Sequence, residues 1–486
     1  MPNPLFAVKP LELLLREAQE TGERSLKRSL GPYQLVALGV GGIIGAGIFT
    51  LTGVAAATRA GPALVISFVF AAIGCAFAGL CYSEFSTMIP IAGSAYTYSY
   101  ATMGELLAWI IGWDLVLEYA VGAATVSIGW SGTLVSLLHH FNIHLPPALV
   151  ASPWQPVQLA DGTIIHGIFN LPAVFIVAMI SLLLVKGIEE SSWVNTVIVF
   201  LKVTVIVIFI AIGWKYIQPA NLTPLIPKNT TGEFGAFGWS GILAGAGMIF
   251  FAYIGFDAVS TAAQEARNPK RDMPIGIFGS LAVCTVLFIL YCYVLTGVVS
   301  YKDLNVAAPL SLALERIPYG WLSVAMNLAV LAGLTSVMLV MLLGQSRVFY
   351  TMSRDGLLPR IFSDIHPTFR TPWRCNLLLG LFVALFSAFA PISLVGNMTS
   401  IGTLFAFVLV CGGIIVMRRT HAETPRPFRT PLVPAVPILG MLINITLMLG
   451  LGLSNWARLF VWLVVGLAVY FGYSRHHSRI RSAAVA

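Results

Sequence analysis

The chain has 486 residues, of which 57% are hydrophobic and only 10% are charged, and its formal net charge is +8. Ordinary soluble domains carry about 25% charged residues, so this composition excludes a soluble globular protein and indicates an integral membrane protein. The positive charge does not indicate nucleic-acid binding, because no basic stretch is interleaved with aromatic residues.

Apolar stretches of helical length recur along the whole chain, which predicts an all-α integral membrane protein. Residues 1–31 are polar, lack the apolar core of a cleavable signal peptide, and include an amphipathic stretch from Leu11 to Leu30 that we expect at the inner membrane surface. We predict a short helix in the outer loop 301–316. Twelve transmembrane helices are predicted, at residues 34–58, 62–88, 104–137, 168–187, 191–214, 239–264, 275–299, 320–350, 375–391, 396–417, 434–453 and 456–474.

The distribution of lysine and arginine predicts the orientation. With the N-terminus inside, 21 of the 28 basic residues fall in cytoplasmic segments, and few fall in outer loops. This bias predicts that both termini are cytoplasmic, in the inner (plasma) membrane of the cell. The net charge of +8 is then a topology signal that also favours contact with anionic membrane lipids.

The first span is interrupted by glycine in the run from Gly39 to Phe49. Backbone that leaves the helix at membrane depth exposes N–H and C=O groups, each costing several kcal/mol unless something binds them. The amides of Gly45, Ala46 and Gly47 would begin a new half-helix and suit a carboxylate, whereas the carbonyl of Ile43 suits an ammonium group. The alternative is that these glycines only allow close helix packing.

Asp114 and Glu118 are four residues apart in the third span and lie on the same helical face. An acidic face that points into the bundle would suit a cationic substrate group. The alternatives are an ion pair between helices and a buried neutral acid.

Lys202 lies near the middle of the fifth span, about 11 residues or roughly 16 Å from either end at 1.5 Å per residue. A lysine side chain does not reach the membrane surface over that distance, so Lys202 must face the protein interior. Burial would allow it to lose and regain a proton near neutral pH. The alternative is a permanently charged lysine that joins helices through backbone carbonyls.

A second glycine break is predicted in the sixth span. It lies at Gly241 through Gly247 and is followed by the run from Phe250 to Asp257. Matched breaks in the two halves of a membrane protein indicate a transporter's substrate site. Asp257 would begin a half-helix, where a carboxylate is also favourable simply as a cap. The carbonyls of Phe250, Ala252 and Ile254 are expected to bind an ammonium group. Phe251 or Tyr253 is expected to close over the ligand.

The remaining polar residues indicate no cofactor and no metal site. The six cysteines and the histidines show no paired metal-ligand spacing, and no phosphate-binding loop is present. The sequence shows no pairing of a general base with a nucleophile that would indicate an enzyme. Met341 in the eighth span could line a site beside the breaks, although a methionine in an apolar helix also serves simple packing.

Three segments resemble the cationic amino acid transporter family of the amino acid–polyamine–organocation superfamily. They are GVGGIIGAGIF at 39–49, QEARNPKRDMPIGI at 264–277 and SRDGLLPR at 353–360. The resemblance implies two inverted five-helix repeats, spans 1–5 and 6–10 (residues 32–216 and 236–418), which form a transport core at 32–418. Two additional helices follow at 434–474, and then a cytoplasmic tail at 475–486.

The resemblance also implies roles for individual residues. Lys202 matches the family's span-five lysine, which takes the place of a sodium ion and links protonation to substrate binding. Glu118 and Met341 would lie near the pocket for the substrate side chain. Gln264 departs from the family, in which many relatives have a glutamate here, and Glu265 is then the acid left for an inner-gate ion pair.

We therefore expect a proton-coupled secondary active symporter of amino acids that works by alternating access. The resemblance favours arginine, lysine or ornithine as the substrate, and neutral amino acids such as alanine stay open. The alternative is an amino acid or polyamine exchanger without proton coupling. A small single-span membrane partner is a further possibility that the sequence does not decide.

Overall fold

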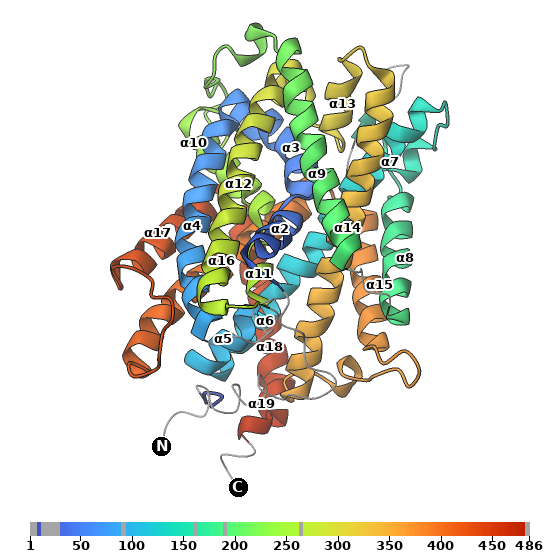
Figure 1. Cartoon of the computed structure of the whole chain (residues 1–486). Coiled ribbons are helices and arrows are strands. Elements are labelled where there is room, and N and C mark those ends of the chain that lie inside the picture. Colours follow the sequence, from blue (N-terminus) through green and yellow to red (C-terminus); the bar gives the residue numbers. More distant parts are fainter. Residues whose placement is uncertain are drawn as a thin grey trace.

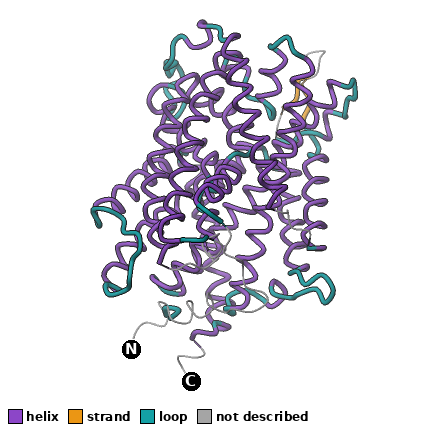
Figure 2. The backbone as a smooth tube through the Cα atoms, in the orientation of Figure 1, coloured by secondary structure: helices purple, strands orange, loops and turns teal. Residues whose placement is uncertain are grey.

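The computed structural model describes residues 7–10, 30–88, 94–154, 156–158, 164–187, 192–261 and 266–481. Figure 2 shows that this part of the chain consists of helices joined by loops, with one short hairpin. The amphipathic stretch predicted from Leu11 to Leu30 lies outside the described residues except for its last residue, and so do Gln264 and Glu265.

The first half of the chain, up to the end of predicted span five, contains eight of the labelled helices and the hairpin. They are α2 (Pro32–Ile43), α3 (Thr52–Ala55), α4 (Leu64–Met88), α5 (Ser94–Thr102), α6 (Glu105–Val116), α7 (Gly122–His140), β1 (Pro156–Gln158), β2 (Ile164–His166), α8 (Leu171–Lys186) and α9 (Ser192–Gly213). The antiparallel pair β1–β2, with Val157 opposite Ile165, was not predicted.

The second half of the chain contains ten labelled helices within the described residues, which range from 3 to 35 residues in length. They are α10 (Gly238–Ile249), α11 (Ala258–Thr261), α12 (Pro269–Val298), α13 (Pro309–Glu315), α14 (Gly320–Arg354), α15 (Trp373–Phe389), α16 (Ile392–Thr420), α17 (Ala435–Gly450), α18 (Leu453–Val469) and α19 (Arg475–His477). The short helix α13 confirms the prediction for the loop 301–316. Helix α5, in contrast, was not predicted.

Seven helical segments within the described residues are long and apolar enough to cross a membrane. Five further apolar helices have 10–17 residues: Pro32–Ile43, Leu171–Lys186, Gly238–Tyr253, Trp373–Phe389 and Ala435–Gly450. The helical membrane-protein class is therefore confirmed. The exact twelve spans and their arrangement as inverted repeats stay predictions.

Local sequence signals explain where helices begin and end, as α8 illustrates. The Asn170 side chain accepts a 3.3 Å hydrogen bond from Ala173 N–H, and Pro172 lies in the first turn, where a missing amide costs nothing. Gly187 ends the helix with φ 77°, a left-handed conformation that glycine adopts without strain.

Helix α2 lies near the centre of the view in Figure 1 and packs on α9, α11 and α12. Helix α14 packs on α7 and α9. Residues 7–10 and the C-terminal tail meet at one end of the bundle, because Lys9 N–H donates to Tyr100 O and Arg479 N–H donates to Asp355 O. The hairpin and α13 lie at the opposite end (Figure 1).

Candidate functional site

The first break separates α2 from the outer part of predicted span one. Ile44 follows α2 with φ −74° and ψ 100°, while its amide still donates to Val40 O. The chain becomes helical again in a wide π-type turn, Gly47–Leu51, and Phe49 N–H donates to Gly45 O over 3.3 Å. The first amides of a helix have no acceptor within it. The structure therefore places Gly45, Ala46 and Gly47 where such amides occur.

The second break lies later than the glycine pattern predicted. Gly241 through Gly247 are helical residues of α10, so the prediction of a break there is wrong. They allow close packing instead: a Cβ on Gly247 would lie 2.7 Å from Leu447 O of α17. The chain leaves the helix only after Ile249, through a 3₁₀ turn at Phe250–Tyr253.

Beyond that turn the backbone is extended and then left-handed. Ile254 has φ −59° and ψ 133°, and Gly255 has φ 114°. Asp257 directly precedes the short helix α11, which is the position predicted for it. Its carboxyl group is therefore available both as a helix cap and as a ligand group.

The two breaks contact each other directly. A Cβ on Gly47 would overlap the backbone of Ala252, and a Cβ on Gly42 would lie 3.1 Å from Gly255 O. A Cβ on Gly255 would in turn lie 3.2 Å from the amide nitrogen of Ile43. The structure thus brings together the two interrupted segments that the sequence placed more than 200 residues apart.

Other helices enclose this contact. A Cβ on Gly45 would lie 3.4 Å from the side chain of Val337 in α14, and a Cβ on Gly129 in α7 would lie 3.7 Å from that of Ala46. All the predicted site residues are buried, up to the 7% exposure of Met341. The candidate site is therefore closed to solvent in this structure.

The aromatic residues of the second break point to different neighbours. Tyr253 donates from its hydroxyl to Phe68 O of α4 over 3.1 Å and packs edge-on against Phe288 of α12. Phe250 packs against Phe407 of α16. These contacts hold Tyr253 in place, which leaves Phe251 as the stronger candidate for a residue that closes over a ligand.

Three carboxyl groups gather beside the breaks. Glu118 lies close to both Asp114 and Asp257, and each of the three is 1% exposed. Neither oxygen of Asp114 has a hydrogen-bond partner within the described residues, and the Glu118 carboxyl group makes only loose approaches to Asp257 and Thr403. Buried polar atoms normally have partners, so these oxygens can accept hydrogen bonds from a ligand or from water.

Tyr119 also belongs to this group, and the sequence analysis missed it. Its hydroxyl donates to Asp257 Oδ2 over 3.3 Å. Tyr119 lies in a π-type turn, Leu117–Val121, whose wider geometry is not evident from an apolar pattern. The one sequence signal was its position next to Glu118.

Met341 faces the same region. A Cβ on Gly122 would lie 3.4 Å from Met341 Sδ. Gly122 is four residues after Glu118, so both lie on nearly the same side of that helix. Met341 thus packs against the helix that follows the turn containing Glu118, and its closeness to Glu118 itself stays a prediction.

Lys202 reaches the interrupted helix α2 from α9. Its side chain is 2% exposed, and Nζ donates to Gly41 O over 2.9 Å. Gly41 lies in the last turn of α2, where carbonyls lack intrahelical partners and the helix dipole favours a cation. This contact suits both predicted roles, a lysine that exchanges a proton and one that permanently joins two helices.

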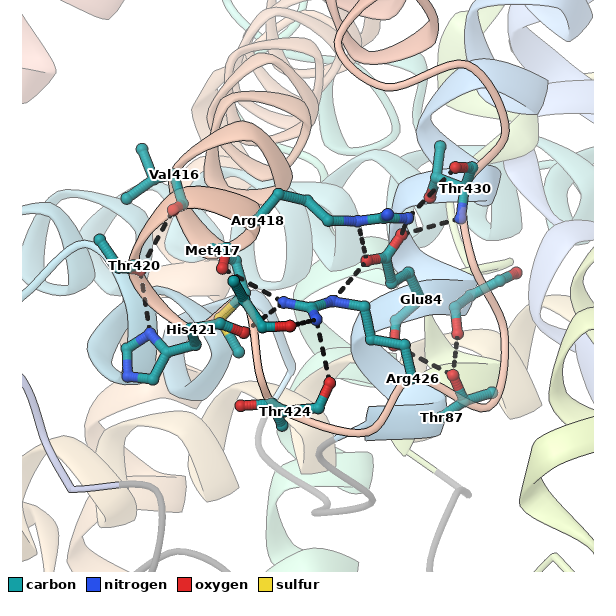
Figure 3. Close-up of polar contacts among 12 residues, drawn as sticks. Glu84, Thr87, Val416, Met417, Arg418, Thr420, His421, Thr424, Arg426 and Thr430 are labelled. Atoms are coloured by element: carbon teal, nitrogen blue, oxygen red, sulfur yellow. Dashed lines mark hydrogen bonds and ion pairs between the residues drawn. The ribbon is translucent and has the colours of Figure 1, made fainter.

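Glu84 forms a second polar cluster, near the C-terminal end of α4 (Figure 3). Its carboxylate is fully buried and accepts from Arg418 Nε over 2.8 Å and from Arg418 Nη2 over 2.9 Å. Arg426 Nε lies 3.2 Å from Oε1, and Thr430 N–H donates to Oε2 over 2.8 Å. This cluster joins α4 to the end of α16 and to the segment before α17.

The terminal segments are held at the same end of the bundle. Lys9 Nζ lies 3.4 Å from Asp355 Oδ1, and Tyr96 donates to Asp355 Oδ2 over 2.7 Å. Glu105, at the start of α6, pairs with Arg481 over 2.9 Å and accepts from Tyr470 over 2.9 Å. These contacts fasten both terminal segments to the same end of the bundle.

Metal-binding side chains do not cluster in the described part of the chain. No group of three His, Cys, Asp or Glu side chains among the described residues could hold a metal ion. All six cysteines are buried thiols.

Comparison with known proteins adds the family to this geometry. Residues 30–470 match the family described as amino acid permease. The chain is 44% identical over 476 residues to a methylthioribose transporter of Bacillus subtilis, covering 98% of this chain and 99% of that protein. It is also 44% identical over 481 residues to the branched-chain amino acid permease BcaP of Bacillus subtilis, covering 99% and 100%. Human cationic amino acid transporter 4 is 29% identical over 594 residues, covering 98% and 90%.

Proposed function

Because the chain belongs to the amino acid permease family, we propose that it is a proton-coupled symporter of amino acids that works by alternating access. Membership of this family makes it a transporter rather than an enzyme. We place it in the plasma membrane with both termini in the cytoplasm. The meeting of both terminal segments at one end of the bundle supports that orientation.

The paired breaks support recognition of an α-amino acid head. Amides at Gly45, Ala46 and Gly47 suit the substrate carboxylate, because a helix N-terminus attracts anions. Carbonyls of Ile43 and of the turn at Phe250–Tyr253 suit the ammonium group. Both poles of a zwitterion would then be bound largely by backbone, and a buried charged residue would not be needed for the head itself.

The contact of Lys202 with Gly41 is the observation that carries the proposal of proton coupling. A protonated Lys202 holds the inner half of the first broken span against α9, with Nζ 2.9 Å from Gly41 O. Release of substrate to the cytoplasm requires that inner half to move, which breaks this contact. Loss of the proton weakens the contact and favours the move, so proton release and substrate release are linked.

For the side chain of the substrate, we place a neutral aliphatic amino acid first. The relative with 44% identity that is named for branched-chain amino acids supports this order. Met341 supports it as well, because its apolar thioether packs at Gly122, in the helix that follows the turn containing Glu118. Cationic amino acids are the second candidate, and the buried carboxyl groups of Asp114 and Glu118 support them.

Uptake into proteoliposomes tests the proposal. Labelled leucine, alanine and arginine would be supplied separately, with and without an inward proton gradient, to the unaltered protein and to Lys202→Ala. Unlabelled methylthioribose would be added as a competitor. We expect the gradient to stimulate uptake of leucine or alanine and the variant to lose that stimulation.

The same assay identifies the alternative. Uptake that ignores the gradient but rises when the liposomes are preloaded with an unlabelled amino acid would indicate an exchanger and refute symport. Preference for arginine would reverse the substrate order without affecting the proton coupling.

A further inference from the structure

The side chain of Lys202 crosses the surface of α14 at one glycine. A Cβ on Gly333 would lie 3.0 Å from both Cγ and Cε of Lys202 and 3.4 Å from Cδ. A separation of 3.0 Å is tighter than nearly all real contacts of this kind, so one of the two groups would have to shift. The lysine therefore lies directly on bare backbone.

The backbone of α14 gives no other reason for this glycine. Gly333 lies within an uninterrupted helix, Gly320–Arg354, and is not among the glycines with positive φ. Glycine is a poor residue for a helix interior, because alanine stabilises the same position better. The space occupied by Lys202 is the feature that accounts for it.

A second glycine lies at the other end of the same side chain. Gly41 of α2 provides the carbonyl that accepts from Nζ. A Cβ on Gly41 would overlap Val199, which is one turn before Lys202 on α9. Two missing side chains, one on α2 and one on α14, thus let this part of α9 approach both helices.

Few ionisable groups face Lys202 from the elements packed on α9. Helix α12 provides the thiol of Cys284 and the buried Tyr291, and its charged residues lie in its first turn, at least 12 residues before Cys284. Helix α2 contains no Asp, Glu, His, Lys or Arg. The arginines of α14, Arg347 and Arg354, are at least 14 residues from Gly333, or about 20 Å at 1.5 Å per residue. The Gly41 carbonyl, which accepts from Nζ, is a contact that a change in the protonation of Lys202 would affect directly.

We propose that Gly333 is a positioning residue for proton coupling: its bare backbone allows Lys202 to reach the Gly41 carbonyl. The proposal rests on the proposed function of Lys202. A methyl group at position 333 would displace the lysine stem and lengthen or misdirect the bond to Gly41. Protonation of Lys202 would then be coupled less strongly to the position of α2.

The test compares the unaltered protein with Gly333→Ala, Lys202→Ala and the double variant. Gly320→Ala is the matched control, because it is in the same helix and a Cβ there would have no neighbour nearer than 3.8 Å. Initial uptake rates are measured over a range of external pH, and thermal unfolding midpoints are measured in detergent.

For Gly333→Ala we expect gradient-driven uptake to fall about fivefold, the factor that corresponds to one ordinary hydrogen bond. We also expect the pH of half-maximal uptake to shift and the unfolding midpoint to fall. In the Lys202→Ala background, the same methyl group should not lower the midpoint and could raise it, because the lysine stem is no longer there and alanine favours the helix. Gly320→Ala should match the unaltered protein.

Equal destabilisation by Gly333→Ala in both backgrounds, or an unchanged pH profile, would overturn the proposal and leave Gly333 as a helix-packing residue. If Gly333→Ala alone does not fold, a folded double variant supports the proposal and an unfolded one overturns it. Gradient-stimulated uptake that survives in Lys202→Ala refutes the proposed function instead. The unfolding midpoints would still decide whether Gly333 positions the lysine.

Discussion

Replacing Glu84 by glutamine should destabilise the folded protein strongly while preserving the shape of the side chain. Glu84 is fully buried, and its two oxygens accept three hydrogen bonds and also face Arg426 Nε. Glutamine has one acceptor oxygen, and its amide group would face donors. Two arginines would also lose their shared counter-charge.

The structure indicates the size of the effect. Breaking a buried ion pair by removing one partner costs about 3–5 kcal/mol. The Arg426 side chain is 3% exposed, but that of Arg418 is 25% exposed and can be partly solvated. We therefore expect a loss of about 3 kcal/mol in the free energy of unfolding, at the lower end of that range.

Thermal or denaturant unfolding in detergent would measure this loss. Glu423→Gln is the matched control, because Glu423 is exposed in the same inner segment. A double variant, Glu84→Gln with Arg426→Gln, should lose less than the sum of the single variants, because the two residues contact each other. If Glu84→Gln and Glu423→Gln have the same unfolding midpoint, the cluster does not stabilise the protein and the reasoning is refuted.

Two further predictions concern the candidate site. Lys202→Arg should fold but lose gradient-stimulated uptake in proteoliposomes, because arginine keeps its proton at any accessible pH. Retained stimulation would favour a permanently charged lysine that joins helices. Gly47→Ala should lower the unfolding midpoint and abolish uptake, because its Cβ would overlap the backbone of Ala252, whereas Gly472→Ala, with no atom within 4 Å of its Cβ, should change neither. A Gly47→Ala variant with normal uptake would contradict the direct contact between the breaks.

Local patterns predicted the elements that depend on local properties. The break at Ile44–Ala46 was predictable, because closely spaced glycines weaken a helix and four of them fall within the seven residues from Gly39 to Gly45. The same pattern failed at Gly241 through Gly247, since glycine serves both close packing and backbone breaks. Only the neighbours, such as Leu447 of α17, decide between these two roles.

Long-range and atypical features were beyond sequence patterns. Arg418 and Arg426 are more than 330 residues from Glu84, and one sequence gives no sign that they meet it. Helix α5 escaped prediction because its sequence, SAYTYSYAT, mixes aromatic and hydroxyl residues without an apolar stripe. The burial of Lys202 was predicted from its position in the middle of the fifth span, but its acceptor, Gly41 O, was identified only in the structure.

The cluster at Glu84 has a consequence for biosynthesis. Glu84 and Arg418 are separated by 334 positions, so this carboxylate leaves the ribosome long before its partner. At about 5–20 residues per second, roughly 20 to 70 s of translation pass between them. During that interval Glu84 lacks the two arginines that surround it in the folded protein. A chain that ends before Arg418 never acquires them, so the contact that joins α4 to the end of α16 forms only after nearly the whole chain has been made.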